Sequence, residues 1–254
     1  MKSKQVRVIS RLDIKAPNLI KGIRLEGLRV MGDPQVFACD YYAQGIDEIL
    51  YMDVVASLYE RSTLHDVLRH AVERVFIPIT VGGGIRSLQD ATEILSLGAD
   101  KIAINTAAVK QPELIAQIAC QVGSQAVVLS VECKREQHGW QVYTDNGREK
   151  TGRDVFEWVS QAHELGVGEV LLTSVDREGT RKGYDLELLQ AVSDRVRLPI
   201  IASGGFGELK HASEAAAIDH VTAIAVADCL HYKRFTVKQI KQQLSADGFA
   251  VRTV

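Results

Sequence analysis

Short apolar runs alternate with longer amphipathic stretches along the whole chain. The runs are nearly continuous in aliphatic residues, as expected for parallel strands that are buried on both faces. They predict strands at residues 6–12, 48–54, 77–81, 101–105, 126–132, 169–175, 198–203 and 222–227. Between the strands, apolar residues at helical spacing predict helices, for example at 64–75, 88–98 and 112–123.

Eight strands that alternate with helices in 254 residues are the pattern of a (β/α)8 or TIM barrel. The alternative is an open doubly wound sheet, which would show GxGxxG after the first strand. Here the first strand is followed by DIKAPN instead. We therefore expect an α/β fold with one (β/α)8 barrel domain over residues 1–254.

The second half of the chain repeats the strand pattern of the first. DEILYMDVVASLYERS aligns with GEVLLTSVDREGTRKG, IPITVGGG with LPIIASGG, and SRLDIK with LSVECK. Strand one thus matches strand five, and the order is kept through strands four and eight. The sequence predicts a barrel made of two duplicated half-barrels, at about 1–123 and 124–254.

Two acidic residues occupy equivalent places in the repeat. Asp13 and Glu132 end strands one and five, so they should face each other across the mouth of the barrel. The carboxyl ends of barrel strands are where active sites lie. Burial there should raise the pKa of each carboxyl group and suit it to proton transfer. The alternative is a pair of rim carboxylates tied to Lys15 and Lys134.

Glycine-rich turns follow strands three and seven, in TVGGGIRS and IASGGFGE. A backbone without Cβ atoms can bring its N–H groups close to an anion. The alternative is that both are only tight turns. Two such turns on opposite sides of one mouth predict a long substrate with a phosphate at each end. The candidate substrate-binding residues are Lys21, Asp53, Gly83, Gly84, Asn105, Thr106, Thr173, Asp176, Gly179, Ser203, Gly204 and Gly205.

Charged residues also mark where four strands begin, namely Arg7, Glu48, Lys101 and Glu169. Apolar side chains ordinarily close a barrel floor. Two basic and two acidic residues could form a salt-bridged ring there, which would be a gate for a small molecule. The alternative is four separate, solvated strand ends.

Composition narrows the classes of function. The apolar content of 46%, the charged content of 24% and the net charge of −2 are ordinary for a soluble globular protein, with no nucleic acid or membrane partner. No apolar run is long enough to span a membrane and no signal peptide is visible. The four cysteines form no CxxC pair and the seven histidines no HxH or HExxH cluster. We expect a cytoplasmic protein without a metal or cofactor.

Longer stretches of the chain resemble a known family. The matching stretches are LDIK, KGI, GDP, DEILYMDVVAS, VFIPITVGGGIRS, GADKIAINTAAV, YTDNGREKTG, GEVLLTSVDREGT, GYDLEL and IASGGFG. In this order they resemble the cyclase subunit family of imidazole glycerol phosphate synthase (HisF) over nearly the whole length.

The resemblance implies a lyase-type enzyme of histidine biosynthesis. It also implies a glutaminase (HisH-type) subunit at the N-terminal face of the barrel. Ammonia from that partner would pass along the barrel axis and add to a bisphosphorylated ribulosyl aminoimidazole carboxamide. The products would be imidazole glycerol phosphate and the aminoimidazole carboxamide ribotide.

Several residues match the family pattern one by one. Asp13 matches the first catalytic aspartate, and Lys21 matches the lysine of the first loop. The four charged residues at the strand starts match the family's gate. Gly84 and Thr106 match one phosphate loop of the family, and Gly204 and Gly205 match part of the other.

Departures from the family concentrate near the chemistry. Glu132 replaces the second catalytic aspartate, Glu178 replaces an aspartate in DREGT, and Asp228 replaces a small hydroxyl residue. A carboxylate displaced by about 1 Å can cost on the order of 100-fold in rate. An ionised Asp228 would also repel a phosphate. Strand one reads SRLDIK where the family has CLD.

Four functions stay open on the sequence. The first is the histidine-pathway cyclase. The second is a related protein that uses tunnelled ammonia for acetamidino modification of a nucleotide sugar in surface polysaccharide synthesis. The third is a catalytically silent conduit that only activates its glutaminase. A sister isomerase with two opposed acids ranks lowest, because it needs no charged gate.

Overall fold

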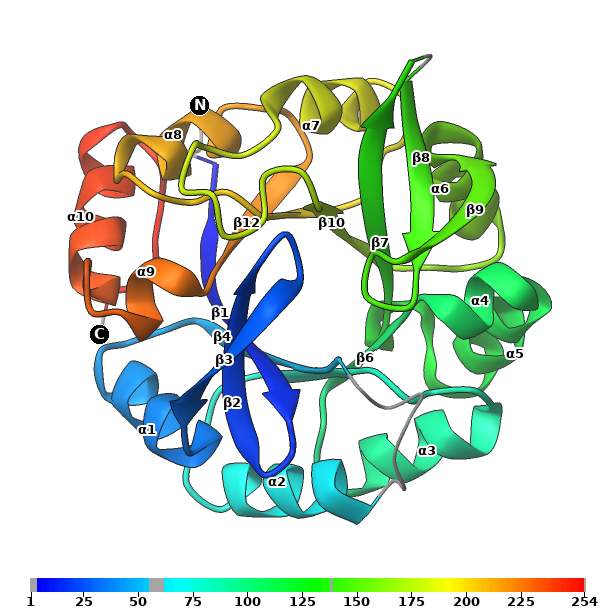
Figure 1. Ribbon diagram of the computed structural model, residues 1–254, viewed down its shortest axis with the longest axis horizontal. Helices are drawn as coiled ribbons and strands as arrows, with labels where there is room; N and C mark the ends of the chain where they lie inside the picture. The colour runs from blue at the N-terminus through cyan, green and yellow to red at the C-terminus, as the bar shows by residue number, and fades with distance from the viewer. Residues whose placement is uncertain (1–3, 55–61, 138, 254) are drawn as a thin grey trace.

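The structure is a closed barrel of parallel strands surrounded by helices (Figure 1). It is a computed structural model, which describes residues 4–54, 62–137 and 139–253. All eight predicted barrel strands are present, in this order around the barrel: β1 (Arg7–Lys15), β4 (Glu48–Asp53), β5 (Ile79–Gly82), β6 (Lys101–Ile104), β7 (Val127–Glu136), β10 (Glu169–Ser174), β11 (Ile200–Ser203) and β12 (Val221–Val226).

Pairing of β7 with β10 and of β12 with β1 closes the circle of strands. The predicted (β/α)8 barrel is confirmed, and the open sheet is excluded. The segment 55–61 of the aligned repeat lies outside the described residues.

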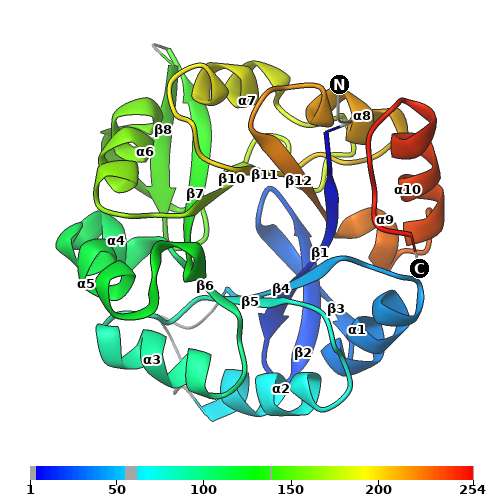
Figure 2. The same cartoon turned by 180° about the vertical axis from the view of Figure 1, so that it is seen from behind.

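Helices form a ring around the strands, as both faces of the barrel show (Figures 1 and 2). The three predicted examples correspond to α2 (Ser62–Val72), α3 (Leu88–Ser96) and α5 (Glu113–Val122). The other helices are α1 (Pro34–Ala43), α4 (Thr106–Lys110), α6 (Val155–Glu164), α7 (Leu186–Ser193), α8 (Lys210–Ala216), α9 (Asp228–His231) and α10 (Val237–Ala246), and η1 (Ser124–Ala126) is a 3-10 turn. No helix of the described segments is long and apolar enough to cross a membrane.

Several of these helices have a side-chain cap at their N-terminus. Asp33, Ser87, Asp154 and Asp185 each accept a backbone N–H of the first helical turn of α1, α3, α6 and α7. Thr236 forms a capping box with Gln239 at the start of α10. These residue types satisfy N–H groups that have no partner within the helix. The starts of these five helices are therefore fixed locally by the sequence.

Two antiparallel hairpins rise from the mouth of the barrel. The connection after strand five forms the hairpin of β8 (Gly139–Thr144) and β9 (Glu149–Asp154), with Asp145 and Asn146 at φ 50° and 58°. The connection after strand one is a second hairpin, β2 (Asn18–Ile23) and β3 (Glu26–Gly32), which the sequence did not predict. Its turn residues Arg24 and Leu25 have φ 54° and 63°, although neither is a usual residue for that conformation.

The β2–β3 hairpin lies across the barrel mouth (Figure 1). The Arg24 N–H donates to the Glu178 carbonyl oxygen over 2.8 Å, and the Asn146 side chain donates to the Leu25 carbonyl oxygen over 3.3 Å. Gly179 packs so closely that a Cβ there would lie 2.7 Å from the Gly22 carbonyl oxygen. Two loops of the second half of the chain thus hold a hairpin of the first half.

Side chains alternate inward and outward along the barrel strands, which sorts the interior into layers. The middle layer is an apolar cluster, made of Ile9, Leu50, Met52, Ala103, Val128, Leu171, Ile201, Ala223 and Ala225. A larger apolar core lies between the strands and the helices. Polar and charged side chains of the interior are therefore confined to the floor and the mouth.

Asp47 joins the barrel floor to the C-terminal part of the chain. One carboxylate oxygen accepts the Val8 N–H over 2.8 Å. The other accepts Lys241 Nζ over 2.6 Å and Arg252 Nε over 3.0 Å. Lys241 also donates to the Gly45 carbonyl oxygen over 2.7 Å. This buried cluster ties β1 to α10 and to the tail that follows it.

We expect Asp47→Ala to lower the free energy of unfolding by about 3 kcal/mol, because it leaves the buried Lys241 ammonium without its counter-ion. Urea denaturation followed by circular dichroism measures this loss. Asp100→Ala is the matched control, since Asp100 accepts the Ile79 N–H in the same way over 2.8 Å but is exposed. The control should lose about 1 kcal/mol. Equal losses in the two variants would contradict a role for the Lys241 pair.

Candidate functional site

The two glycine turns have the backbone conformation that requires glycine. Gly83 and Gly84 have φ 94° and 73°, and Gly204 and Gly205 have φ 90° and 110°. A Cβ at Gly83 would lie 2.2 Å from the Asp53 carbonyl oxygen, and one at Gly205 would lie 2.1 Å from the Gly183 carbonyl oxygen. Tight turns alone therefore explain the glycines, and phosphate binding at them stays a prediction.

A cavity of about 580 Å³ opens beside the first glycine turn. This is the size of a small-molecule site. Its lining includes seven residues of interest: Asp53, Gly83, Gly84, Asn105, Thr106, Glu132 and Asn146. The structure thus brings together six of the predicted site residues in one hollow at the carboxyl ends of β4, β5, β6 and β7. The β8–β9 turn contributes Asn146.

The second glycine turn borders a much smaller cavity, of about 20 Å³. Its lining residues include Arg11, Gly179, Ser203, Gly204, Gly205 and Asp228. Two contacts join Arg181 to the Asp228 carboxylate, Nε to Oδ1 over 2.5 Å and Nη2 to Oδ2 over 3.0 Å. The two turns are equivalent in sequence but differ in the space beside them. The Arg181 guanidinium offsets the negative charge of Asp228 that we expected to repel a phosphate.

Asp13 lies among cations at the mouth end of β1. Its Oδ1 accepts Arg11 Nε over 2.8 Å, and its Oδ2 lies 3.8 Å from Lys21 Nζ. Lys21 also pairs with Glu178. Burial alone would raise the pKa of Asp13, but the Arg11 guanidinium and the Lys21 ammonium outweigh it and hold that pKa below its ordinary value. The expectation of a raised pKa is wrong for Asp13, because strand one places a cation two residues away on the same face.

The pKa of Glu132 is raised, as expected, unlike that of Asp13. Burial raises its pKa to about 7, although the Arg11 charge and the hydrogen bond from the Gly147 N–H oppose the shift. That N–H donates to Glu132 Oε2 over 2.8 Å. Lys134, the alternative partner, instead lies 4.6 Å from the centre of the Tyr143 ring. A carboxyl group that titrates near neutral pH can both give and take a proton.

Among the predicted binding residues outside the large cavity, Thr173, Ser203 and Asp176 have polar partners that show what they do. Thr173 and Ser203 hold the Arg11 guanidinium through their hydroxyl oxygens, at 3.1 and 3.3 Å from Nη1. The Asp176 carboxylate accepts the Arg135 N–H over 2.8 Å, at the edge of the hairpin that follows β7. Thr173 and Ser203 therefore support the mouth from below, and Asp176 supports the hairpin.

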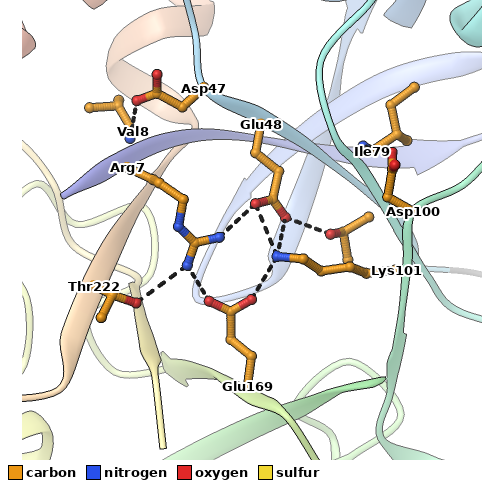
Figure 3. Close-up of polar contacts among 10 residues, drawn as sticks. Arg7, Val8, Asp47, Glu48, Ile79, Asp100, Lys101, Glu169 and Thr222 are labelled. Carbon is orange, nitrogen blue, oxygen red and sulfur yellow. Dashed lines mark hydrogen bonds and ion pairs between the residues drawn. The ribbon is translucent and has the colours of Figure 1, made fainter. Parts of the chain in front are cut away.

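The four charged residues at the strand starts form one closed ring (Figure 3). Arg7 Nη1 lies 2.7 Å from Glu48 Oε2, and Arg7 Nη2 pairs with Glu169. Lys101 Nζ lies 3.2 Å from Glu48 Oε2 and 2.8 Å from Glu169 Oε2. The alternative of four separate solvated ends is excluded, since both glutamates are buried. Passage of ammonia through the ring stays a prediction.

Arg11 and Arg181 are two charged site residues that the sequence analysis missed, beside Asn146 of the large cavity. Arg11 carried a signal: it stands two residues before Asp13 in a buried strand, so both must face the barrel interior. Its side chain is 2% exposed. Arg181 lies in the loop after β10 and carried no comparable signal. In the described segments, no group of three or more His, Cys, Asp or Glu side chains is arranged to hold a metal ion.

Comparison with known proteins identifies the family of the chain. A sequence model of the histidine biosynthesis protein family matches residues 7–236. The chain is 61% identical over 206 residues to the imidazole glycerol phosphate synthase subunit HisF of Legionella pneumophila, an alignment that covers 81% of this chain and 97% of the relative. It is 46% identical over 254 residues to the HisF subunit of Thermobifida fusca (strain YX), covering 97% and 98%.

These relatives do not favour the nucleotide-sugar alternative. The match runs through the gate, both glycine turns and both carboxylate positions, all of which lie within residues 7–236. From the barrel, its charged floor and these similarities, the chain belongs to the histidine biosynthesis protein family, among the HisF subunits of imidazole glycerol phosphate synthase.

Proposed function

We propose that the chain is a lyase-type enzyme subunit that adds ammonia to a bisphosphorylated ribulosyl aminoimidazole carboxamide. The products are imidazole glycerol phosphate and the aminoimidazole carboxamide ribotide. A glutaminase subunit supplies the ammonia at the floor of the barrel. The observation that carries the proposal is the ion ring at one end of a closed barrel whose other end holds two buried carboxyl groups.

The ring fits a gate for a small neutral molecule. It contains two cations and two anions in alternation, so every charge has two opposite neighbours. Beyond it lies the apolar layer of the interior, in which a neutral ammonia molecule costs far less to hold than an ammonium ion. Ions are held at the ring, and the neutral species can pass toward the mouth.

The mouth fits an anionic acceptor. The large cavity reaches from the first glycine turn to Glu132, so a phosphate at Gly83 and Gly84 would leave the rest of the molecule beside the carboxyl group. Thr106 offers a hydroxyl group at the start of α4 in the same lining. Arg181 and the turn at Gly204 offer a second anion site on the other side of the mouth.

The floor of the barrel fits a docking face for the glutaminase. Phe76 is 73% exposed just before β5, and aromatic side chains are enriched where proteins contact one another. A hollow of about 360 Å³ adjoins it and is lined by Val75, Ile77, Pro78 and Asp100. Asp100 directly precedes Lys101 of the ring, so a partner on this surface would deliver ammonia next to the gate.

We expect Asp13→Asn to lower ammonia-driven turnover of the bisphosphate on the order of 100-fold, as removal of a group that stabilises charge in the transition state does. Turnover is measured at alkaline pH with an ammonium salt and the purified chain. Glu187→Gln is the matched control, because Glu187 is an exposed carboxylate paired with Arg135. It should leave turnover unchanged. An Asp13→Asn variant with nearly full activity would count against the proposed chemistry.

We expect Glu169→Ala to reduce glutamine-driven turnover about tenfold more than turnover with free ammonia, because it leaves Arg7 and Lys101 undercompensated at the entrance. Both rates are measured in the complex with the glutaminase subunit. Thr222→Val is the control, since it removes only a 3.3 Å contact to Arg7 and keeps all four charges. Equal losses with both nitrogen sources would argue against passage through the floor.

We expect Asp228→Ser to lower the dissociation constant for inorganic phosphate about tenfold, because it removes a negative charge and frees Arg181 for the anion. Titration calorimetry measures the constant. The double variant Asp228→Ser with Arg181→Ala should lose the gain. Phosphate binding that stays the same in Asp228→Ser would show that the second turn is not an anion site.

A further inference from the structure

Arg11 is a buried cation inside the barrel, where apolar side chains are usual. Residues 7, 9, 11 and 13 of β1 share one face, so Arg11 lies between the apolar layer and Asp13. Its guanidinium reaches across to the hydroxyl oxygens of Thr173 on β10 and Ser203 on β11, at 3.1 and 3.3 Å. A charge in this position is costly unless it is paired. Its paired anion is Asp13, through Nε and Oδ1 at 2.8 Å.

Asp13 is therefore held by cations from two elements. Arg11 comes from its own strand, and Lys21 comes from β2 of the hairpin over the mouth. Glu178, in the loop after β10, pairs with Lys21, and His231 of α9 also faces Asp13. Asp13 is not among the described residues that line the large cavity. Its surroundings favour a fixed negative charge.

Glu132 has the opposite surroundings. It lines the large cavity, and its Oε2 accepts a hydrogen bond from a neutral donor, the Gly147 N–H. The charges that face it are Arg11 from β1, Asp13 from β1 and Asp145 from the β8–β9 turn. Burial and the two acids oppose ionisation of Glu132, and Arg11, whose Nε is bonded to Asp13, offsets them only in part. Glu132, the carboxyl group that lines the cavity, is thus the one whose ionised form is less stabilised.

We propose that Arg11 gives the two acids different roles. It holds Asp13 as a fixed carboxylate, and Glu132 is the group that exchanges protons with the acceptor. The inference rests on the proposed function and deepens it. Arg11 is a positioning residue, since it acts through Asp13. Glu132 is the catalytic residue, since it faces the cavity in which the acceptor would lie.

The proton balance of ammonia addition suits this division. When the ammonia nitrogen bonds to the carbonyl carbon of the ribulosyl chain, the carbonyl electron pair moves to oxygen. The neutral Glu132 carboxyl group gives that oxygen a proton. The new carbon–nitrogen centre carries a surplus proton, which returns to the Glu132 carboxylate. Asp13 stays ionised throughout and stabilises the transient positive charge on nitrogen.

The direct test is titration of both carboxyl groups by carbon-13 NMR, in the full chain labelled at Asp and Glu side chains. Asp13→Asn and Glu132→Gln identify the two signals. We expect Glu132 to titrate near neutral pH, and Asp13 to show no titration between about pH 5 and pH 9. Since no turnover is measured, this result is independent of the substrate. An Asp13 signal that titrates near neutral pH, or a Glu132 signal that does not, would overturn the proposal.

The second test replaces Arg11. Arg11→Met should bring the Asp13 titration upward into the measured range, and should lower kcat with ammonia about tenfold while KM for the bisphosphate stays within about twofold. Arg11→Lys keeps a cation, so it should restore the charged Asp13 and most of kcat. If Arg11→Met does not fold, Arg11→Lys and the unaltered chain still give both titrations.

The two proposals fail in different ways. If the unaltered chain shows no turnover with ammonia and the bisphosphate, the proposed substrate is wrong, whatever the titrations show. If turnover is present but Asp13 stays charged in Arg11→Met, the role given to Arg11 is wrong and the proposed function stands. A loss of kcat in Arg11→Lys as large as that in Arg11→Met would also overturn the role of Arg11.

Discussion

Closure of the strands into one circle decides what each interior side chain can contact. The pairing of β7 with β10 sets Thr173 opposite Glu132, and the pairing of β1 with β4 sets Asp13 opposite Met52. Because side chains alternate along each strand, a residue's position in its strand also fixes its depth in the barrel. The register of the strands therefore places the ion ring, the apolar layer and the carboxyl groups at three successive depths along the barrel axis.

Charge inside the barrel is balanced in small neutral groups. At the floor, Arg7 and Lys101 face two glutamates, and at the mouth Arg11 and Lys21 face Asp13 and Glu178. Each group holds two positive and two negative side chains, which limits the cost of burying them. Glu132 stands outside both groups, and this is why burial acts on it without full compensation. The raised pKa of Glu132 thus follows from the fact that the nearby cations pair with other acids.

Much of the molecule could be predicted from the sequence. Buried parallel strands have a strong apolar signal, so the barrel and its eight strands were predicted to within a few residues. Strand starts and ends locate the floor and the mouth, which brought the four ring residues and both acids to the correct ends.

The rest depends on contacts between distant segments. The β2–β3 hairpin was not predicted, because its turn at Arg24 and Leu25 lacks the usual Asn or Gly. The low pKa of Asp13 depends first on Arg11 and then on Lys21, and Lys21 reaches Asp13 only because that hairpin folds over the mouth. The small space beside the second glycine turn is lined in part by Arg11 and Glu178, which come from distant segments that the sequence repeat does not bring together.

The position of Lys21 on the hairpin has a mechanical consequence. Glu178 binds the hairpin twice, through its carbonyl oxygen at Arg24 and through its carboxylate at Lys21. Any displacement of β2 and β3 away from the mouth would carry Lys21 with it and leave both Asp13 and Glu178 with one cation fewer. Access to the interior and the charge that acts on Asp13 would thus change together with the position of the β2–β3 hairpin.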